Sequence, residues 1–157
     1  MKLIKKDKRY LNNDICRFIK AQENDYQQAL SEITLGRKKS HWMWYIFPQF
    51  IGLGYGETSK FFAIKSLNEA KKYLEHPILG SRFKEITNAL LKLDTDNANQ
   101  IFGSPDDLKL KSCMTLFSVA CNEDDNIFKK VIDKYFDNSL DKRTLKLLNK
   151  SKTMQEN

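Results

Sequence analysis

Apolar side chains recur at steps of three and four residues along most of this chain, which places them on one face of an α-helix. The repeat is clearest over residues 14–36 and 127–136, and no stretch shows the period-two alternation typical of a half-buried β-strand. At 157 residues the chain has the size of one domain. We therefore predict a single all-α domain of about seven helices with short loops over residues 14–149, flanked by a basic segment at 1–13 and a tail at 150–157.

Capping residues predict where three of these helices begin. Ser66 and Glu69 have the spacing of a capping box, in which the serine hydroxyl accepts a hydrogen bond from the glutamate amide. Ser104 is predicted to be an N-cap with Pro105 at the first helical position, where the missing N–H of proline has no cost. Asp141 is placed to cap the last helix.

The net charge of +7 is concentrated at the two ends of the chain. Residues 1–10 carry five basic residues against one acidic residue, and residues 141–157 carry five against two. The remaining residues, 11–140, contain 17 of each sign. The domain itself is therefore neutral, and the charge does not predict a nucleic-acid-binding domain. The basic ends leave open a weak, salt-sensitive attraction to nucleic acid.

The cysteines and the apolar runs predict a cytoplasmic protein. Three cysteines without a CxxC pair fit reduced thiols. The longest apolar run, residues 42–47, is far shorter than the ~20 residues of a membrane helix, and the first residues lack the apolar core of a signal peptide. The two histidines have no metal-ligand spacing, so we expect no metal and no cofactor. The oligomeric state is left open.

Residues 36–49 bring basic, hydroxyl, imidazole and indole groups together in one short stretch. Ser40 is predicted to cap a short helix over residues 42–47. Cations and free amides at the start of a helix attract anions, so Arg37, Lys38 and Ser40 are predicted to bind a phosphate or carboxylate group. The alternative is a solvated loop in which the serine only caps the helix.

Two indole rings, an imidazole and an amide extend this first cluster. Trp42 and Trp44 are two residues apart and therefore lie on different faces of a helix. One of them is predicted to stack on a base or sugar ring while the other is core, the alternative being that both are core. Gln49 ends the stretch and is included among the ligand-binding residues. His41 is a candidate general acid or base, since histidine often transfers protons near neutral pH, and a structural histidine is the alternative.

A second polar cluster recurs every three residues, at Asp106, Lys109, Ser112 and Thr115. Such a stripe is either plain solvent surface or the second wall of a pocket shared with Lys38 and His41. In the pocket interpretation Lys109 and Ser112 bind the ligand. Asp106 is then the carboxylate available as a base or to position a water molecule.

The two clusters together predict a pocket for a small anionic ligand, either phosphorylated or nucleotide-like. Whether the protein is an enzyme is left open. The alternative is a non-enzymatic module that binds nucleic acid or a protein partner through the basic ends and exposed aromatic groups. We expect no membrane association.

Longer motifs cover most of the region from residue 15 to residue 148. They read GRKKSHWMWYIFPQ with GLG, YLEHP with LG, IFG, DDLKLKS and MTLF. These motifs resemble those of an uncharacterised, mostly bacterial family of domains of unknown function that is sometimes labelled calpastatin. The resemblance implies a multihelical cytoplasmic domain without an established activity. The label implies protease inhibition, which we do not expect because this chain lacks the low hydrophobicity of a disordered inhibitor.

Overall fold

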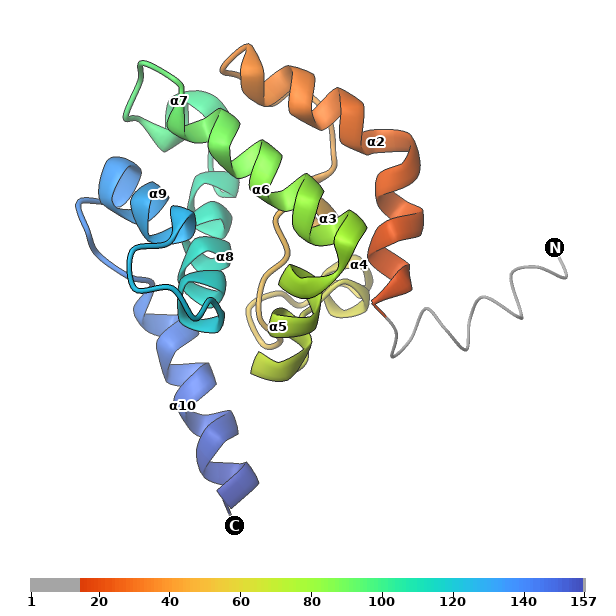
Figure 1. Cartoon of the computed structure of the whole chain (residues 1–157), viewed down its shortest axis with the longest axis vertical. Helices are drawn as coiled ribbons and strands as arrows, with labels where there is room; N and C mark the ends of the chain where they lie inside the picture. Colours follow the sequence, from red (N-terminus) through yellow and green to blue (C-terminus); the bar gives the residue numbers. More distant parts are fainter. Residues whose placement is uncertain (1–14, 157) are drawn as a thin grey trace, which may run out of the picture.

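A computed structural model describes residues 15–156 of the chain, with side chains to residue 153 (Figure 1). Within this part all regular structure is helical, and β pairing is limited to an isolated parallel bridge between Phe50 and Ile64. The prediction of an all-α domain is therefore confirmed. The helices are α2 Cys16–Thr34, α3 Met43–Ile46, α4 Glu57–Phe61, α5 Leu67–Glu75, α6 Pro77–Leu91, α7 Ala98–Phe102, α8 Asp106–Ala120, α9 Ile127–Phe136 and α10 Lys142–Glu156.

The described residues form nine helices, whereas the sequence predicted about seven. The difference comes from α4 and α7, which have five residues each. A helix of that length makes little more than one turn, so its apolar residues cannot show a 3.6-residue repeat. The predicted boundary at residue 149 falls inside α10, and the predicted basic segment 1–13 lies outside the described residues.

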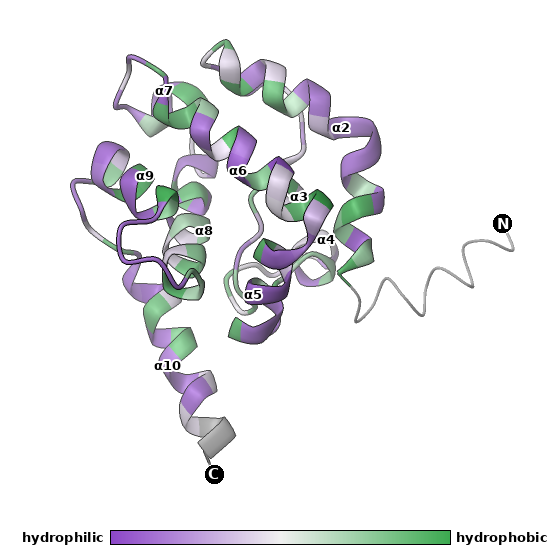
Figure 2. Ribbon diagram, in the orientation of Figure 1, coloured by the Kyte–Doolittle hydropathy of each residue, from purple (hydrophilic) through white to green (hydrophobic). Residues whose placement is uncertain are grey.

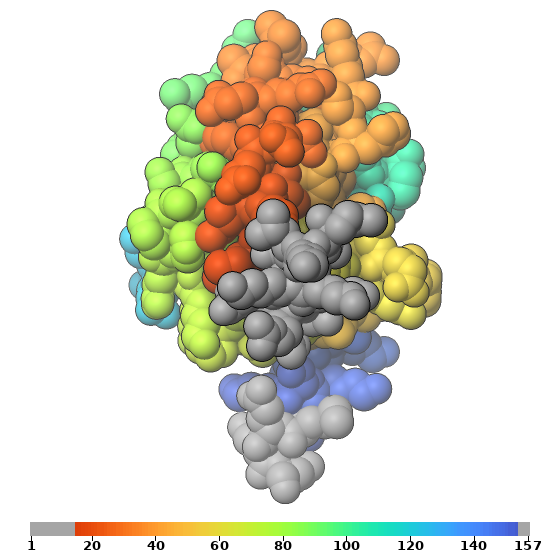
Figure 3. Space-filling view, turned by 90° about the vertical axis from the view of Figure 1, so that its right-hand side faces the viewer, coloured from red at the N-terminus to blue at the C-terminus, as the bar shows by residue number. Residues whose placement is uncertain are grey.

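Helices α6 and α8 occupy the centre of the molecule. Helix α6 packs against α2, α5 and α9, while α8 packs against α5, α7, α9 and α10. Figure 1 shows α2 and α9 on opposite sides of α6, and Figures 1 and 3 both show α10 extending away from the body. Figure 2 shows hydrophilic and hydrophobic residues interspersed along the helices, as expected of amphipathic elements. None of the described helices has the length and apolar character to cross a membrane.

An aromatic cluster joins the central helices. Phe83 of α6 lies 4.7 Å from the Phe117 ring of α8 and 5.0 Å from the Phe128 ring of α9, measured between ring centroids. Tyr73 of α5 meets Phe83 edge-on at 5.6 Å. All four side chains are buried. Such pairs contribute roughly 0.5–1.5 kcal/mol each beyond their buried area, so this cluster fixes the relative positions of four helices.

Two of the predicted caps are confirmed. The amide of Glu69 donates to the hydroxyl of Ser66 at 3.0 Å, and this bond starts α5. The amide of Thr144 donates to the Asp141 carboxylate at 2.9 Å, two residues after α10 begins. Both caps satisfy amides that have no acceptor within their own helix.

The predicted start of α8 is wrong by one residue. Pro105 precedes the helix instead of occupying its first position, and Ser104 makes no capping bond. The reason is that Asp107, within the first turn, accepts a hydrogen bond from the Leu108 amide at 2.9 Å. The Pro105 carbonyl also accepts from the Leu108 amide, at 3.0 Å. This amide in the first turn therefore has acceptors without the serine hydroxyl.

A buried arginine ties the beginning of α2 to the rest of the fold. The Arg17 side chain is fully buried and forms an ion pair with Glu69 of α5 at 2.9 Å. Its guanidinium also donates to the carbonyl oxygens of Phe61 and Ala63, each at 2.8 Å. These three partners lie 44 to 52 residues further along the chain, so this one side chain joins α2 to α5 and to the end of α4.

Replacing Arg17 by leucine is expected to destabilise the protein by roughly 3–5 kcal/mol, since one partner of a buried ion pair is removed and the other is left uncompensated. Urea unfolding at pH 7, followed by circular dichroism, measures the change in the free energy of unfolding. Replacement of exposed Glu23 on the same helix by leucine should change the free energy of unfolding by less than about 0.5 kcal/mol. A loss below about 1 kcal/mol for the arginine variant would contradict its structural role.

Candidate functional site

The loop after α2 leaves the helix through a glycine and is pinned to α7. Gly36 has a φ of 86°, a left-handed conformation that glycine adopts without strain. Its position immediately after the C-cap confirms the prediction that it ends the first helix. Two residues later the Lys38 amide donates to the Ile101 carbonyl of α7 at 2.8 Å. The backbone of this loop is thus held at both ends.

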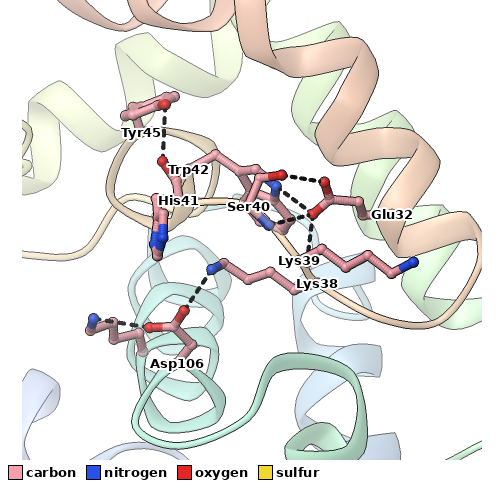
Figure 4. A network of polar contacts seen from close by, with 9 residues as sticks. Glu32, Lys38, Lys39, Ser40, His41, Trp42, Tyr45 and Asp106 are labelled. Carbon is pink, nitrogen blue, oxygen red and sulfur yellow. Dashed lines mark hydrogen bonds and ion pairs between the residues drawn. The ribbon is translucent and has the colours of Figure 1, made fainter.

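A buried glutamate of α2 organises the same loop (Figure 4). The Glu32 carboxylate accepts hydrogen bonds from the backbone amides of Lys39 and Ser40, at 2.7 and 2.9 Å. The Ser40 hydroxyl donates to it at 2.6 Å, and the Trp42 indole N–H donates at 3.0 Å. Four donors from Lys39, Ser40 and Trp42 therefore converge on the carboxylate of Glu32, a residue that is 7% exposed.

This network corrects the prediction that Ser40 caps the aromatic helix. The position before α3 is held by Trp42 without a side-chain cap, while the Ser40 hydroxyl bonds Glu32 and accepts a hydrogen bond from Gln28 at 2.7 Å. The hydroxyl turns toward α2 because a hydrogen bond to an ionised carboxylate is stronger than the bond to a backbone amide with which it would cap the four-residue helix α3.

The Glu32 carboxyl remains ionised in this setting. Burial alone raises the pKa of the carboxyl, but the hydrogen bonds from the loop outweigh burial and lower the pKa to about 2. The folded state therefore favours the ionised carboxylate more strongly than the unfolded chain does, in which the carboxyl has its ordinary pKa of 4.5.

Two lysines from distant parts of the chain meet at one carboxylate of α8. Lys38 Nζ lies 3.0 Å from Asp106 Oδ2, and Lys109 Nζ lies 2.9 Å from Asp106 Oδ1. Each ammonium also lies over an indole ring, Lys38 at 5.2 Å from the Trp42 centroid and Lys109 at 4.3 Å from that of Trp44. We call Lys38, Asp106 and Lys109 the lysine–aspartate triad.

The triad is partly open to solvent and carries one positive charge in excess. The exposed fractions of the side chains are 9% for Lys38, 17% for Asp106 and 23% for Lys109. Burial raises the pKa of the Asp106 carboxyl, but the two lysines outweigh burial and lower it, so the group is ionised at neutral pH. Figure 4 shows the exposed His41 side chain pointing toward the triad, and that of Lys39 directed away from it.

The remaining predicted ligand-binding residues lie apart from the triad or are engaged elsewhere. Trp42 is 1% exposed and packs against the Phe102 ring, so it belongs to the core and Trp44 is the half-buried member of the pair. The buried Ser112 hydroxyl donates to the Asp141 carboxylate at 3.3 Å, close to the start of α10. Thr115 accepts from the Asp141 amide at 2.8 Å, so this end of the polar stripe holds α10.

Arg37 and Gln49 occupy two further environments. The Arg37 side chain is exposed on the loop beside the triad. Gln49 is 6% exposed and lines a separate small cavity next to Trp44. Sequence reasoning missed Glu32, although a signal was present: Glu32 falls three residues after buried Ala29, on the apolar face of the first helix.

A larger cavity lies away from these residues. It has a volume of about 520 Å³ and is formed by α5, α6 and the loop between α8 and α9. Lys71 and Lys84 line it together with Glu75 and Glu123, so its charges balance. A balanced lining gives no preference for an anion, in contrast to the triad. Among the described residues no group of three or more His, Cys, Asp or Glu side chains is placed to hold a metal ion.

Comparisons with known proteins show the family to which this helical domain belongs. The chain matches the family described as "Protein of unknown function (DUF1810)" over residues 12–148, and it belongs to that family. A search of curated proteins found no match. The predicted resemblance to a domain of unknown function is thus confirmed, whereas nothing in these comparisons supports the label calpastatin.

A solved structure has the same fold. The crystal structure of the conserved hypothetical protein Rv1873 from Mycobacterium tuberculosis is similar with a TM-score of 0.82 and 41% sequence identity. The similarity covers 85% of this chain and 94% of that chain.

Replacing Glu32 by glutamine keeps the size of the side chain but removes its charge and one acceptor oxygen. We expect the variant to be about 2 kcal/mol less stable at pH 7, because hydrogen bonds to a charged group contribute roughly 1.5–3 kcal/mol each. The folded pKa is lowered, so this stabilisation is present above the ordinary pKa of 4.5 and is lost as the pH falls from 4.5 toward 2.

Urea unfolding of both proteins at pH 7 and pH 3.5 measures this effect. The difference in the free energy of unfolding between wild type and variant is expected to be about 1 kcal/mol smaller at pH 3.5 than at pH 7. An equal difference at both pH values would show that the charge of Glu32 does not hold the loop.

Proposed function

We propose that the lysine–aspartate triad and the adjoining face of Trp44 form a binding site for a small anionic ligand, either phosphorylated or nucleotide-like. The observation that carries this proposal is the convergence of Lys38 and Lys109 on one carboxylate, with both ammonium groups within 3.0 Å of it. The two lysines are 71 positions apart in the sequence and come from different elements. Only the folded chain creates this pair of cations.

The chemistry of the lysine side chain leaves donors for a ligand. Each ammonium group has three N–H donors, and Asp106 occupies one on each lysine. A phosphate oxygen has the charge and acceptor capacity to take the others. Exposed Arg37 adds a further positive charge on the loop. The Asp106 carboxylate keeps the two ammonium groups close together, which lowers the cost of ordering them when an anion binds.

The half-buried Trp44 ring supplies a flat apolar surface beside the cations. Lys109 lies over this ring at 4.3 Å from its centroid. Indole faces stack on bases and sugar rings, with a contribution of roughly 1–3 kcal/mol per base. A ligand with an anionic group and a planar ring therefore matches both parts of the site.

Two groups at the site have the chemistry for proton transfer. Asp106 is ionised and lies within the triad, and His41 points toward it (Figure 4). In a reaction, Asp106 would orient a water molecule or accept a proton, and His41 would exchange protons with solvent at the open side. Ligand binding requires neither role, so substrate turnover has to be measured separately from binding.

The matched set of lysine variants tests the binding proposal. The melting temperature of the full chain is measured with inorganic phosphate, ribose 5-phosphate and adenosine monophosphate. A ligand at 100 times its Kd stabilises the folded protein by about 2.7 kcal/mol. We expect at least one compound to raise the melting temperature of wild type and of Lys39→Ala, but not that of Lys38→Ala or Lys109→Ala.

The control, Lys39, has the same charge and lies in the same loop, but its side chain is directed away from the triad. Equal responses from all three variants would mean that the anions act through net charge and not at the triad. No response from wild type to any of the compounds would also overturn the proposal.

A second candidate function is a non-enzymatic module that binds nucleic acid through its basic ends. The observation that favours it is α10, which extends away from the body and carries five basic and no acidic residues between positions 142 and 153 (Figures 1 and 3). It requires binding of an oligonucleotide that weakens steeply with salt, and it requires no response to the small phosphates. The same alternative includes a module that binds a protein partner, instead of nucleic acid, through the basic ends.

A further inference from the structure

A buried amide next to the proposed site has a donor without an acceptor. Gln49 is 6% exposed, and within the described part of the chain its Nε2 has no hydrogen-bond partner. Its backbone is fixed, because the Gln49 carbonyl accepts from the Ile64 amide at 2.8 Å. A buried donor without a partner costs about 1–3 kcal/mol, so an acceptor that enters the cavity and meets Nε2 would remove this cost.

The Gln49 side chain lines a narrow cavity of about 20 Å³. Space for one water-sized atom group takes roughly 10–15 Å³, so the cavity holds a single oxygen atom and not a whole ligand. Its other walls come from Trp44, the loop after Phe50 and α4, and they include Ser59 and Lys60.

Gly54 brings this loop against the tryptophan. A Cβ atom on Gly54 would lie 2.5 Å from the Ser59 side chain and 3.1 Å from the Trp44 ring. Only glycine allows the backbone to approach this closely, so the tight wall of the cavity depends on this residue. The same indole therefore borders the cavity and carries Lys109 over its face.

We propose that this cavity receives a neutral carbonyl oxygen of the ligand whose anionic group binds the lysine–aspartate triad, with Gln49 Nε2 donating to that oxygen. This inference rests on the proposed function and specifies the ligand further. Nε2 is a neutral donor, and a neutral carbonyl oxygen is an acceptor that matches it without bringing a charge into the cavity. The ligand class is a small phosphorylated compound with a planar carbonyl-bearing end, such as a uracil-type nucleotide.

Two nucleotides that differ at the base test this specificity. Uridine monophosphate carries ring carbonyl groups, whereas adenosine monophosphate carries none and has the same ribose phosphate. Isothermal titration of the full chain is expected to give at least tenfold tighter binding of the uridine nucleotide. Gln49→Met, which has a similar size and no N–H, is expected to remove this preference while retaining the binding of adenosine monophosphate.

The melting temperature of Gln49→Met separates a ligand role from a structural one. Removal of an unpaired donor is expected to leave the melting temperature unchanged or to raise it. A lower melting temperature with an intact preference would show that the amide is satisfied internally, as by a bound water molecule, and would overturn the inference.

The remaining outcomes are also distinct. If wild type binds both nucleotides equally, the carbonyl site is wrong and the anion site stands. If wild type binds neither nucleotide and the triad variants respond to no phosphate, the proposed function fails and this inference fails with it.

Discussion

Four hydrogen bonds to the Glu32 carboxylate determine the path of the loop that carries Lys38. A loop that begins with a glycine and contains three consecutive basic residues would otherwise be free to sample many conformations. The buried carboxylate selects one of them by fixing two backbone amides, a hydroxyl and an indole. Because Trp42 is one of these donors, the same interaction connects the loop to the aromatic core.

The position of the triad follows from this constraint. With the loop held against α2, the Lys38 amide reaches α7 and its side chain reaches the first turn of α8. The cluster of aromatic rings on α5, α6, α8 and α9 fixes α8 from the other side. Two independent parts of the core therefore set the distance between Lys38 and Lys109. The lysines lie at the edge of a rigid scaffold, as a preorganised binding site requires.

Local patterns predicted those features that depend on neighbouring residues. The helical class, the capping bonds of Ser66 and Asp141 and the role of Gly36 all follow from short-range spacing, and each is present in the structure. The five-residue helices were missed because they are too short for a periodic signal. These successes and failures both lie at the level of secondary structure.

The candidate site depends on contacts that no local pattern encodes. Ser40 was expected to cap the next helix, but its partner is a carboxylate eight residues earlier, on the buried face of α2. Lys38 and Asp106 belong to two polar clusters of the sequence, but their contact depends on how the fold holds the loop against α2 and α7. The unpaired amide donor of Gln49 likewise depends on residues distant in the sequence that surround it in the folded chain.

The affinity of Glu32→Gln for adenosine monophosphate tests the central claim most directly. The titration is made at a temperature at which circular dichroism shows the variant to be folded. Glu32 is buried beneath the loop and does not belong to the triad. Loss of its negative charge would by itself favour an anion, so a weaker affinity must come from a change in the position of the loop. We expect binding at least tenfold weaker than that of wild type. An unchanged affinity would show that the Glu32 network supports the fold without building the site.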